Sequence, residues 1–405
     1  MNARALLLSG VATVLIAGML AGCSTSEASI DGTRTLETAA TYLDRRVEWW
    51  MAWPGAARDH GTFCISCHTA LPYVLSRAAL ADRLSENTPS DIERKLFDNV
   101  TTRVRLWLEV EPYYHDTAEK VAESRGTEAV LNALILASRD SRTHRLQGDT
   151  RTAFDHMWAL QQTTGERAGA WPWLQFDLSP WEGSDSEFYG AALAALAAAT
   201  APADHSSVAR QERVALLRSY LDREYAKQPL SNRLMVLWAS AKWPELLDEA
   251  RRRSLVVELF RDQQADGGWS LSSLAESVGR SSWKTSLRSW TRNDRALLGT
   301  KSDGYATGLV TFALSFSDES RTVEFQKGVG WLKRHQNSSE GYWPGYSLNK
   351  RRDLSSNIGR FMSDAATAFA VLALTRPVAD QLTRGPSPGC MNHPSTGTTA
   401  LGARC

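Results

Sequence analysis

Two kinds of helical segment alternate along this chain of 405 residues. The first kind is rich in Ala, Leu and other small or apolar residues, and each segment starts with Ser, Thr, Asp or Gly, which favour a helix N-terminus. These segments are 69–82, 126–139, 185–199, 231–242, 304–317 and 364–375. The second kind is amphipathic and rich in Arg and Glu, and its segments are 36–53, 90–109, 150–163, 207–224, 246–264 and 322–336. A helix that is apolar all round is buried, whereas an amphipathic helix has one solvated face.

The strict alternation predicts an all-α fold in which six inner helices are wrapped by six outer helices, an (α/α)6 toroid. Residues 36–376 would form this single domain. We expect residues 1–22 to be a lipoprotein signal peptide, 23–35 a lipidated linker and 377–405 an irregular tail rich in Pro, Ser, Gly and Thr.

The charges are balanced, which excludes some partners. The chain has 46 Lys and Arg against 45 Asp and Glu, and Arg4 is the single charge in residues 1–22, so the remainder is neutral. A neutral chain offers no field of one sign to attract nucleic acid. We therefore expect no nucleic-acid partner, and the balance favours a small apolar or neutral ligand, or a cavity whose electrostatic field is local rather than global.

The N-terminus predicts export. Arg4 precedes an apolar run from Ala5 to Leu20, which is too short for a membrane-spanning helix and is typical of a signal peptide. Leu20-Ala21-Gly22-Cys23 resembles the bacterial lipobox, which implies cleavage before Cys23 and a lipid on its thiol. By the habit of lipobox proteins, Ser24 after the cysteine implies sorting to the outer membrane, facing the periplasm, if the organism is Gram-negative; a plain signal peptide is the alternative. A lipid on Cys23 would anchor the protein to the membrane without a spanning helix.

Cys64-Ile65-Ser66-Cys67-His68 is C-x-x-C-H, the attachment signature of a c-type haem. Its two thiols would form thioethers with the haem and His68 would bind the iron. The alternatives are a Cys64–Cys67 disulfide, a redox pair, or a zinc site that would also need Cys390 and His393; we expect no zinc. An exported protein seldom keeps free thiols, so we expect Cys390 and Cys405 to form a disulfide.

The sixth iron ligand stays open, because no separate cytochrome module is recognisable around the motif. The candidates are His60, His115, Met51 and Met362. A haem at this position would sit against the helical domain, at the mouth of its central cavity, and would point to a redox partner.

Gln263-Gln264-Ala265-Asp266-Gly267-Gly268-Trp269 resembles the QW repeat of the squalene cyclase and prenyltransferase superfamily. Degenerate copies run from Gln161 to Trp171 and from Gln336 to Trp343. The resemblance implies the toroid, with each Gln ending an outer helix and the Trp stacked against it after a Gly-rich turn.

The catalytic residues of that superfamily are missing. The D-x-D-D acid motif of the cyclases does not occur, the nearest sequence being Asp185-Ser186-Glu187. No Cys lies between Cys67 and Cys390, so the prenyltransferase zinc ligands are absent, as is the C-G-E-Q thioester motif. Whether the protein is an enzyme is therefore open, because a fold does not fix an activity.

One face of the toroid should hold the functional site. The connections from outer to inner helices are mostly long, and they are 54–68, 110–125, 164–184, 225–230, 265–303 and 337–363. Long loops on one face are where a scaffold carries function. Aromatic residues in these loops could line a ligand cleft: Tyr113, Tyr114, Trp173, Trp181, Trp283 and Trp290. Trp171, Trp269 and Trp343 are better explained as structural residues of the repeat.

Charged residues at the expected starts of inner helices are candidates for catalysis or cation binding: Arg125, Glu128, Asp185, Glu187, Asp303 and Asp364. Asp185, Asp303 and Asp364 could instead be helix N-caps. His115 could be an axial ligand or a surface residue.

Three functions remain. The first is a haem-bearing envelope lipoprotein with an electron-transfer or redox role on a bound ligand. The second is a non-redox enzyme on the same barrel, resembling a polysaccharide lyase or glycosidase, or processing terpenoids. The third is a ligand-binding toroid in which Cys64 and Cys67 form a disulfide.

Overall fold

The computed structural model describes residues 17–86, 88–202, 208–275, 299–316 and 322–376. All regular elements in this part of the chain are helices joined by loops, and its only β-type pairings are two isolated bridges. A helix lies at each of the twelve predicted positions. The apolar helices are α2 (Ala70–Leu84), α4 (Ala118–Ser141), α6 (Ser186–Thr200), α8 (Leu230–Ser240), α12 (Gly304–Leu314) and α14 (Phe361–Thr375). The amphipathic helices are α1 (Ala17–Ala52), α3 (Asp91–Arg105), α5 (Gly148–Ala159), α7 (Val208–Glu224), α9 (Glu249–Arg261) and α13 (Val323–Arg334). A short helix, α10 (Leu271–Leu274), is additional.

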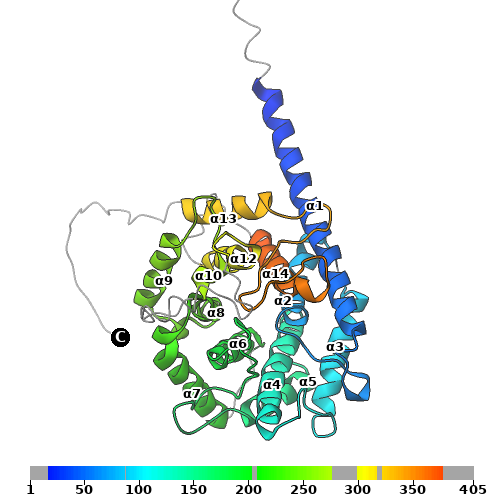
Figure 1. Ribbon diagram of the computed structural model, residues 1–405, viewed down its shortest axis with the longest axis vertical. Coiled ribbons are helices and arrows are strands. Elements are labelled where there is room, and N and C mark those ends of the chain that lie inside the picture. Colours follow the sequence, from blue (N-terminus) through cyan, green and yellow to red (C-terminus); the bar gives the residue numbers. More distant parts are fainter. Residues whose placement is uncertain (1–16, 87, 203–207, 276–298, 317–321, 377–405) are drawn as a thin grey trace, which may run out of the picture.

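The apolar helices form the core. Each contacts the next apolar helix along the chain, and α14 packs against α2, so the six contact one another in a closed cycle. Figure 1 shows α6, α8, α12 and α14 nearer the centre, with α3, α7, α9 and α13 around the periphery. Every residue of α8 and of α12 is buried. Small residues allow these helices to approach closely, because little side-chain volume separates their backbones.

Several helix starts differ from the sequence-based expectation; the starts of α4 and α1 differ most. α4 begins at Ala118 rather than at residue 126, because Thr117 accepts a hydrogen bond from the Lys120 N–H at 3.1 Å and caps the helix. Arg125 and Glu128 therefore lie inside α4 and not at its start. α1 begins at Ala17, upstream of the predicted cleavage site, and its N-terminal part projects beyond the other helices (Figure 1).

The Gln–Trp motif after α13 links this helix to α1. Gln336 Nε2 donates to the carbonyl oxygen of Gly341 at 3.0 Å and to that of Thr35 in α1 at 2.9 Å. Gly341 has a φ of +83°, and an added Cβ would lie 2.2 Å from a carbonyl oxygen of α1, so only glycine fits. Trp343 is fully buried, and its Nε1 donates to the carbonyl oxygen of Leu332 in α13 at 2.7 Å.

The other two copies make the same contacts. Gln161 and Gln263 each donate to the carbonyl of a glycine with positive φ, at 3.2 and 2.9 Å. Each also donates to a carbonyl of the next amphipathic helix, in α7 and α13 respectively. Trp171 and Trp269 are fully buried and bond back to α5 and α9. The structural interpretation of Trp171, Trp269 and Trp343 is confirmed.

One described segment, Ile358–Thr375, has the length and apolar composition of a membrane span, and 78% of it is buried inside the protein. Because α14 packs between α12 and α2, this segment is a core helix of the domain.

Candidate functional site

The C-x-x-C-H motif, residues 64–68, lies in the loop between α1 and α2 and is fixed by both neighbouring amphipathic helices. Trp50 of α1 donates its Nε1–H to the Cys64 carbonyl at 2.8 Å. Asn99 of α3 exchanges two hydrogen bonds with the backbone of Phe63, at 2.8 and 3.1 Å. Ser66, inside the motif, accepts two backbone N–H groups at the start of α2. The motif is therefore an ordered element that starts a core helix.

Both cysteines of the motif are free thiols with little exposure, 8% for Cys64 and 6% for Cys67. Burial raises the pKa of Cys64 to about 11 and that of Cys67 well above its usual value. Both thiols are therefore protonated at neutral pH and are poor nucleophiles on their own, which disfavours a thiolate redox catalyst.

His68 lies in an aromatic cage. Its ring stacks on Phe361 at a centroid distance of 3.8 Å and meets Trp50 edge-on at 5.0 Å, with Trp181 at 6.1 Å. Burial, with smaller contributions from Arg46 and Arg352, lowers the pKa of His68 to about 3. The imidazole is thus neutral at physiological pH, which is the form that binds metals.

Asp364 lies beside this histidine and does not cap a helix, because α14 begins at Phe361. Its carboxylate is buried and accepts hydrogen bonds from Tyr42, Arg46 and Thr69. Thr69 in turn contacts His68. Asp364 therefore belongs to the surroundings of the motif.

Glu182 is a titratable group near the motif that the sequence did not single out. Burial raises its pKa to about 7, and its charge acts on both Cys64 and Cys67 and raises the pKa of each. The only sequence feature that could have indicated Glu182 as a site residue is its position next to Trp181 in a long loop. A carboxyl group with a pKa near neutrality can exchange a proton at physiological pH.

Two loops are joined across this side of the molecule. Asn349 donates to the carbonyl of Ser179 at 2.7 Å and accepts its N–H at 3.2 Å. The loop that carries Trp181 and Glu182 is thereby fixed to the loop that leads into α14, although the two are 170 residues apart. The structure thus brings the third and sixth long connections together beside His68.

The predicted cleft aromatics have different surroundings. Trp181 is the one beside His68, and its ring also meets Tyr305 edge-on at 5.6 Å. Trp173 is 1% exposed and donates to the Trp181 carbonyl at 2.9 Å, so it supports Trp181 from within the core. Tyr113 is buried under the Arg103 guanidinium, 4.8 Å from the ring centre.

Tyr114 is 39% exposed and packs against Phe176. Trp283 and Trp290 lie outside the described residues, as do Cys390 and Cys405.

Arg125 and Glu128 lie in contacts that join α3 and its following loop to α4. Glu128 is fully buried and forms an ion pair with Arg103, with an Nε–Oε1 distance of 2.5 Å. Arg125 donates to the carbonyl of Val110 and stacks over Trp107 at 4.6 Å. These contacts tie α3 and the following loop to α4.

The remaining acids, Asp303, Asp185 and Glu187, have other partners than the motif in the contacts of their side chains. Asp303 is 3% exposed and caps α12, where its carboxylate accepts three backbone N–H groups. The prediction that Asp303 is a helix N-cap is therefore confirmed. Burial raises the pKa of Asp303 to about 6. Asp185 precedes α6 without a side-chain cap bond. Glu187 pairs with Arg167 at 2.8 Å and lines a surface pocket of about 690 Å³.

The candidate sixth ligands differ in accessibility. His60 pairs with Asp59 at 3.0 Å and has a side chain 41% exposed, and His115 pairs with Glu111 at 3.4 Å and is 56% exposed. Met362 is 5% exposed and follows Phe361, whose ring covers His68. Met51 is half-buried at the end of α1. Nothing in these contacts selects one of the four.

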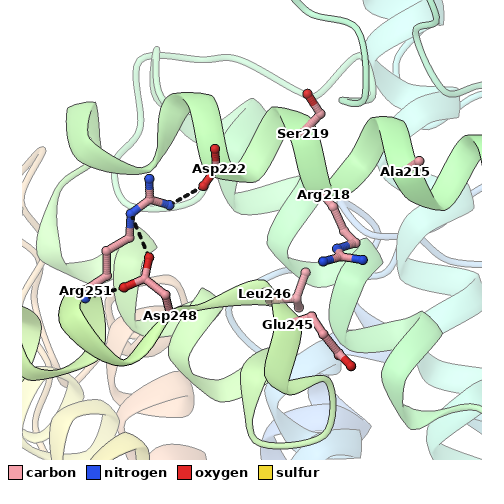
Figure 2. A pocket seen from close by; sticks show the side chains of 8 residues that line it. All are labelled: Ala215, Arg218, Ser219, Asp222, Glu245, Leu246, Asp248 and Arg251. Atoms are coloured by element: carbon pink, nitrogen blue, oxygen red, sulfur yellow. Dashed lines mark hydrogen bonds and ion pairs between the residues drawn. The ribbon is translucent and has the colours of Figure 1, made fainter.

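Figure 2 shows a separate pocket of about 350 Å³ at the surface, between α7 and the segment that leads into α9. Arg251 forms ion pairs with Asp222 and Asp248 inside it. None of the predicted site residues lines this pocket. Its charged lining residues are two arginines and three acids.

The donor set of the motif suits a c-type haem. Within the described part of the chain, no three His, Cys, Asp or Glu side chains converge as a metal site. Two thiols and one neutral imidazole are what covalent attachment and axial ligation of a haem require. No protein-family model matches the chain, and no curated protein matches it.

Proposed function

We propose that this protein is a lipid-anchored lipoprotein of the bacterial cell envelope that carries a c-type haem on Cys64 and Cys67. His68 would be an axial ligand, and the role would be electron transfer or redox chemistry on a small apolar or neutral ligand. The observation that carries the proposal is the C-x-x-C-H motif downstream of a predicted signal peptide, with a neutral His68 at the start of a core helix.

The proposed scaffold is the (α/α)6 toroid of the squalene cyclase and prenyltransferase superfamily. Two observations support it: the closed cycle of contacts among the apolar helices, and the three matching Gln–Trp motifs. The last of these motifs joins α13 to α1, as closure of an outer ring requires.

In this proposal the side chains near the motif have separate tasks. Cys64 and Cys67 hold the group covalently, and haem supplies one-electron chemistry when bound. Phe361 and Trp181 keep water from the His68 ring, because they pack against it. Glu182 can hold or release a proton near the thiols at neutral pH.

The test is a visible spectrum of the full chain, produced with its signal peptide in a bacterium that matures c-type cytochromes. We expect a Soret band for the wild type and none for Cys64→Ser/Cys67→Ser, with matching far-ultraviolet circular dichroism. An exported wild-type protein without a Soret band would overturn the proposal and leave a non-redox enzyme or a binding protein.

The anchor makes an independent prediction. Cys23→Ser should move most of the protein from the membrane fraction to the soluble fraction, because the lipid attaches to this thiol. Ser24→Asp is the matched control: it keeps Cys23, and we expect membrane association with a shift from the outer to the inner membrane. Fractionation and labelling with a radioactive fatty acid measure both. A Cys23→Ser protein that still fractionates with membranes would contradict the anchor.

A further inference from the structure

His68 is connected to a buried carboxylate through a single hydroxyl group. His68 Nδ1 lies 2.8 Å from Thr69 Oγ1, and Thr69 Oγ1 lies 2.6 Å from Asp364 Oδ2. All three residues are largely or fully buried, so water does not compete strongly for these bonds. The chain of contacts therefore determines where its protons lie.

The Asp364 carboxylate accepts four hydrogen bonds, two on each oxygen. Oδ1 accepts the Tyr42 hydroxyl at 2.7 Å and Arg46 Nε at 2.7 Å. Oδ2 accepts Arg46 Nη2 at 3.0 Å and the Thr69 hydroxyl at 2.6 Å. Burial raises the pKa of this carboxyl group, but the buried Arg46 guanidinium donates to both of its oxygens and the Tyr42 hydroxyl donates to one, and these three donors favour the ionised, accepting form.

Arg46 is itself fixed. It donates to the side-chain and backbone oxygens of Asn357 at 2.8 and 2.7 Å and stacks over Trp49 at 4.7 Å. The guanidinium thus has one orientation, and it keeps Asp364 in place against Thr69. The network joins α1, the last long loop, α14 and the start of α2.

The direction of the hydrogen bonds follows from the chemistry of the groups. A hydroxyl has one proton, and Thr69 gives its proton to Asp364, because an ionised carboxylate only accepts. Thr69 Oγ1 must then accept from His68, so Nδ1 carries the imidazole proton. In the neutral ring the lone pair is therefore on Nε2.

We propose that Thr69 and Asp364 are positioning residues that make Nε2 of His68 the iron-binding nitrogen and increase its donor strength. This inference rests on the proposed haem attachment. Hydrogen bonds from a ligating histidine to an acceptor raise its basicity. A more basic ligand favours ferric over ferrous iron, so the relay lowers the reduction potential.

Thr69→Val tests the inference, because valine has the shape of threonine and no hydroxyl. Loss of such an outer hydrogen bond typically costs about tenfold in metal affinity, and a tenfold change in the ferric preference is about 59 mV for one electron. We expect the reduction potential of Thr69→Val to rise by about this amount. Thr69→Ser, which retains the hydroxyl, should restore the wild-type value.

A Thr69→Val protein with the same haem content and an unchanged potential would overturn the relay while leaving haem attachment intact. A second measurement does not need the haem: ¹⁵N NMR of His68 in Cys64→Ser/Cys67→Ser, assigned by comparison with a further His68→Gln variant. We expect the Nδ1–H tautomer, and an Nε2–H tautomer would refute the inference. Absence of haem from the wild type would refute the proposed function and with it the iron-binding role of His68, whereas the tautomer measurement would still test the hydrogen-bond relay by itself.

Discussion

Asp364→Ala should lower the free energy of unfolding by about 3–5 kcal/mol, since breaking a buried ion pair leaves an uncompensated charge. Arg46 is 4% exposed and would keep its guanidinium inside the protein without its partner carboxylate. The hydroxyl groups of Tyr42 and Thr69 would lose their acceptor as well. Chemical denaturation followed by far-ultraviolet circular dichroism measures the change.

Two further variants show whether the pair causes the loss. Arg253→Ala removes an exposed pair with Glu249, both side chains more than 60% exposed, and should cost about 0–1 kcal/mol. Arg46→Met/Asp364→Leu removes both buried charges, so it should lose less stability than Asp364→Ala alone. An Asp364→Ala protein within about 1 kcal/mol of the wild type would contradict a buried ion pair at this position.

Trp343→Ala should cost about 3–5 kcal/mol, because a fully buried indole leaves both a cavity and lost apolar contact. It would also remove the bond from Nε1 to the Leu332 carbonyl, at the place where α13 is joined to α1. The loss should appear in the same denaturation measurement.

Trp343→Phe separates the two contributions. It retains most of the apolar contact and should cost about 1–3 kcal/mol, because the buried carbonyl of Leu332 loses its donor. Leu108→Ala is the control, since Leu108 is 95% exposed and its removal should change stability by no more than about 0.5 kcal/mol. Equal stabilities for Trp343→Ala and Leu108→Ala would show that the motif does not hold the helices together.

The helices could be predicted from the sequence because their signals are local. Periodic apolar residues and capping residues define each segment within a dozen or so positions, and the described helices lie where this pattern predicts them. The Gln–Trp motif is equally local, since Gln, Gly and Trp stand within a few residues of one another. The start of α4 was missed because Glu119 and Lys120 gave the first turn the composition of a loop.

The candidate site was predicted only in part, because its contacts join residues far apart in the chain. Asp364 meets Thr69 across 295 residues and Tyr42 across 322, so nothing local separates this network from a helix cap. Glu182 acquires its pKa from burial, which depends on how loops pack. Trp173 packs closely on Gly190 of α6, where an added Cβ would lie 2.2 Å from the indole ring. This contact, 17 residues along the chain, could not be predicted from a loop rich in aromatic residues.

The covalent attachment of haem is tested most directly by the mass of the proteolytic peptide that contains residues 64–68, taken after acid–acetone extraction of free haem. We predict that the wild-type peptide has its own mass plus that of one haem, and that the peptide of Cys64→Ser/Cys67→Ser has no added haem mass. A peptide of unmodified mass, or one lighter by two hydrogen atoms because Cys64 and Cys67 are joined as a disulfide, would contradict the proposed haem protein.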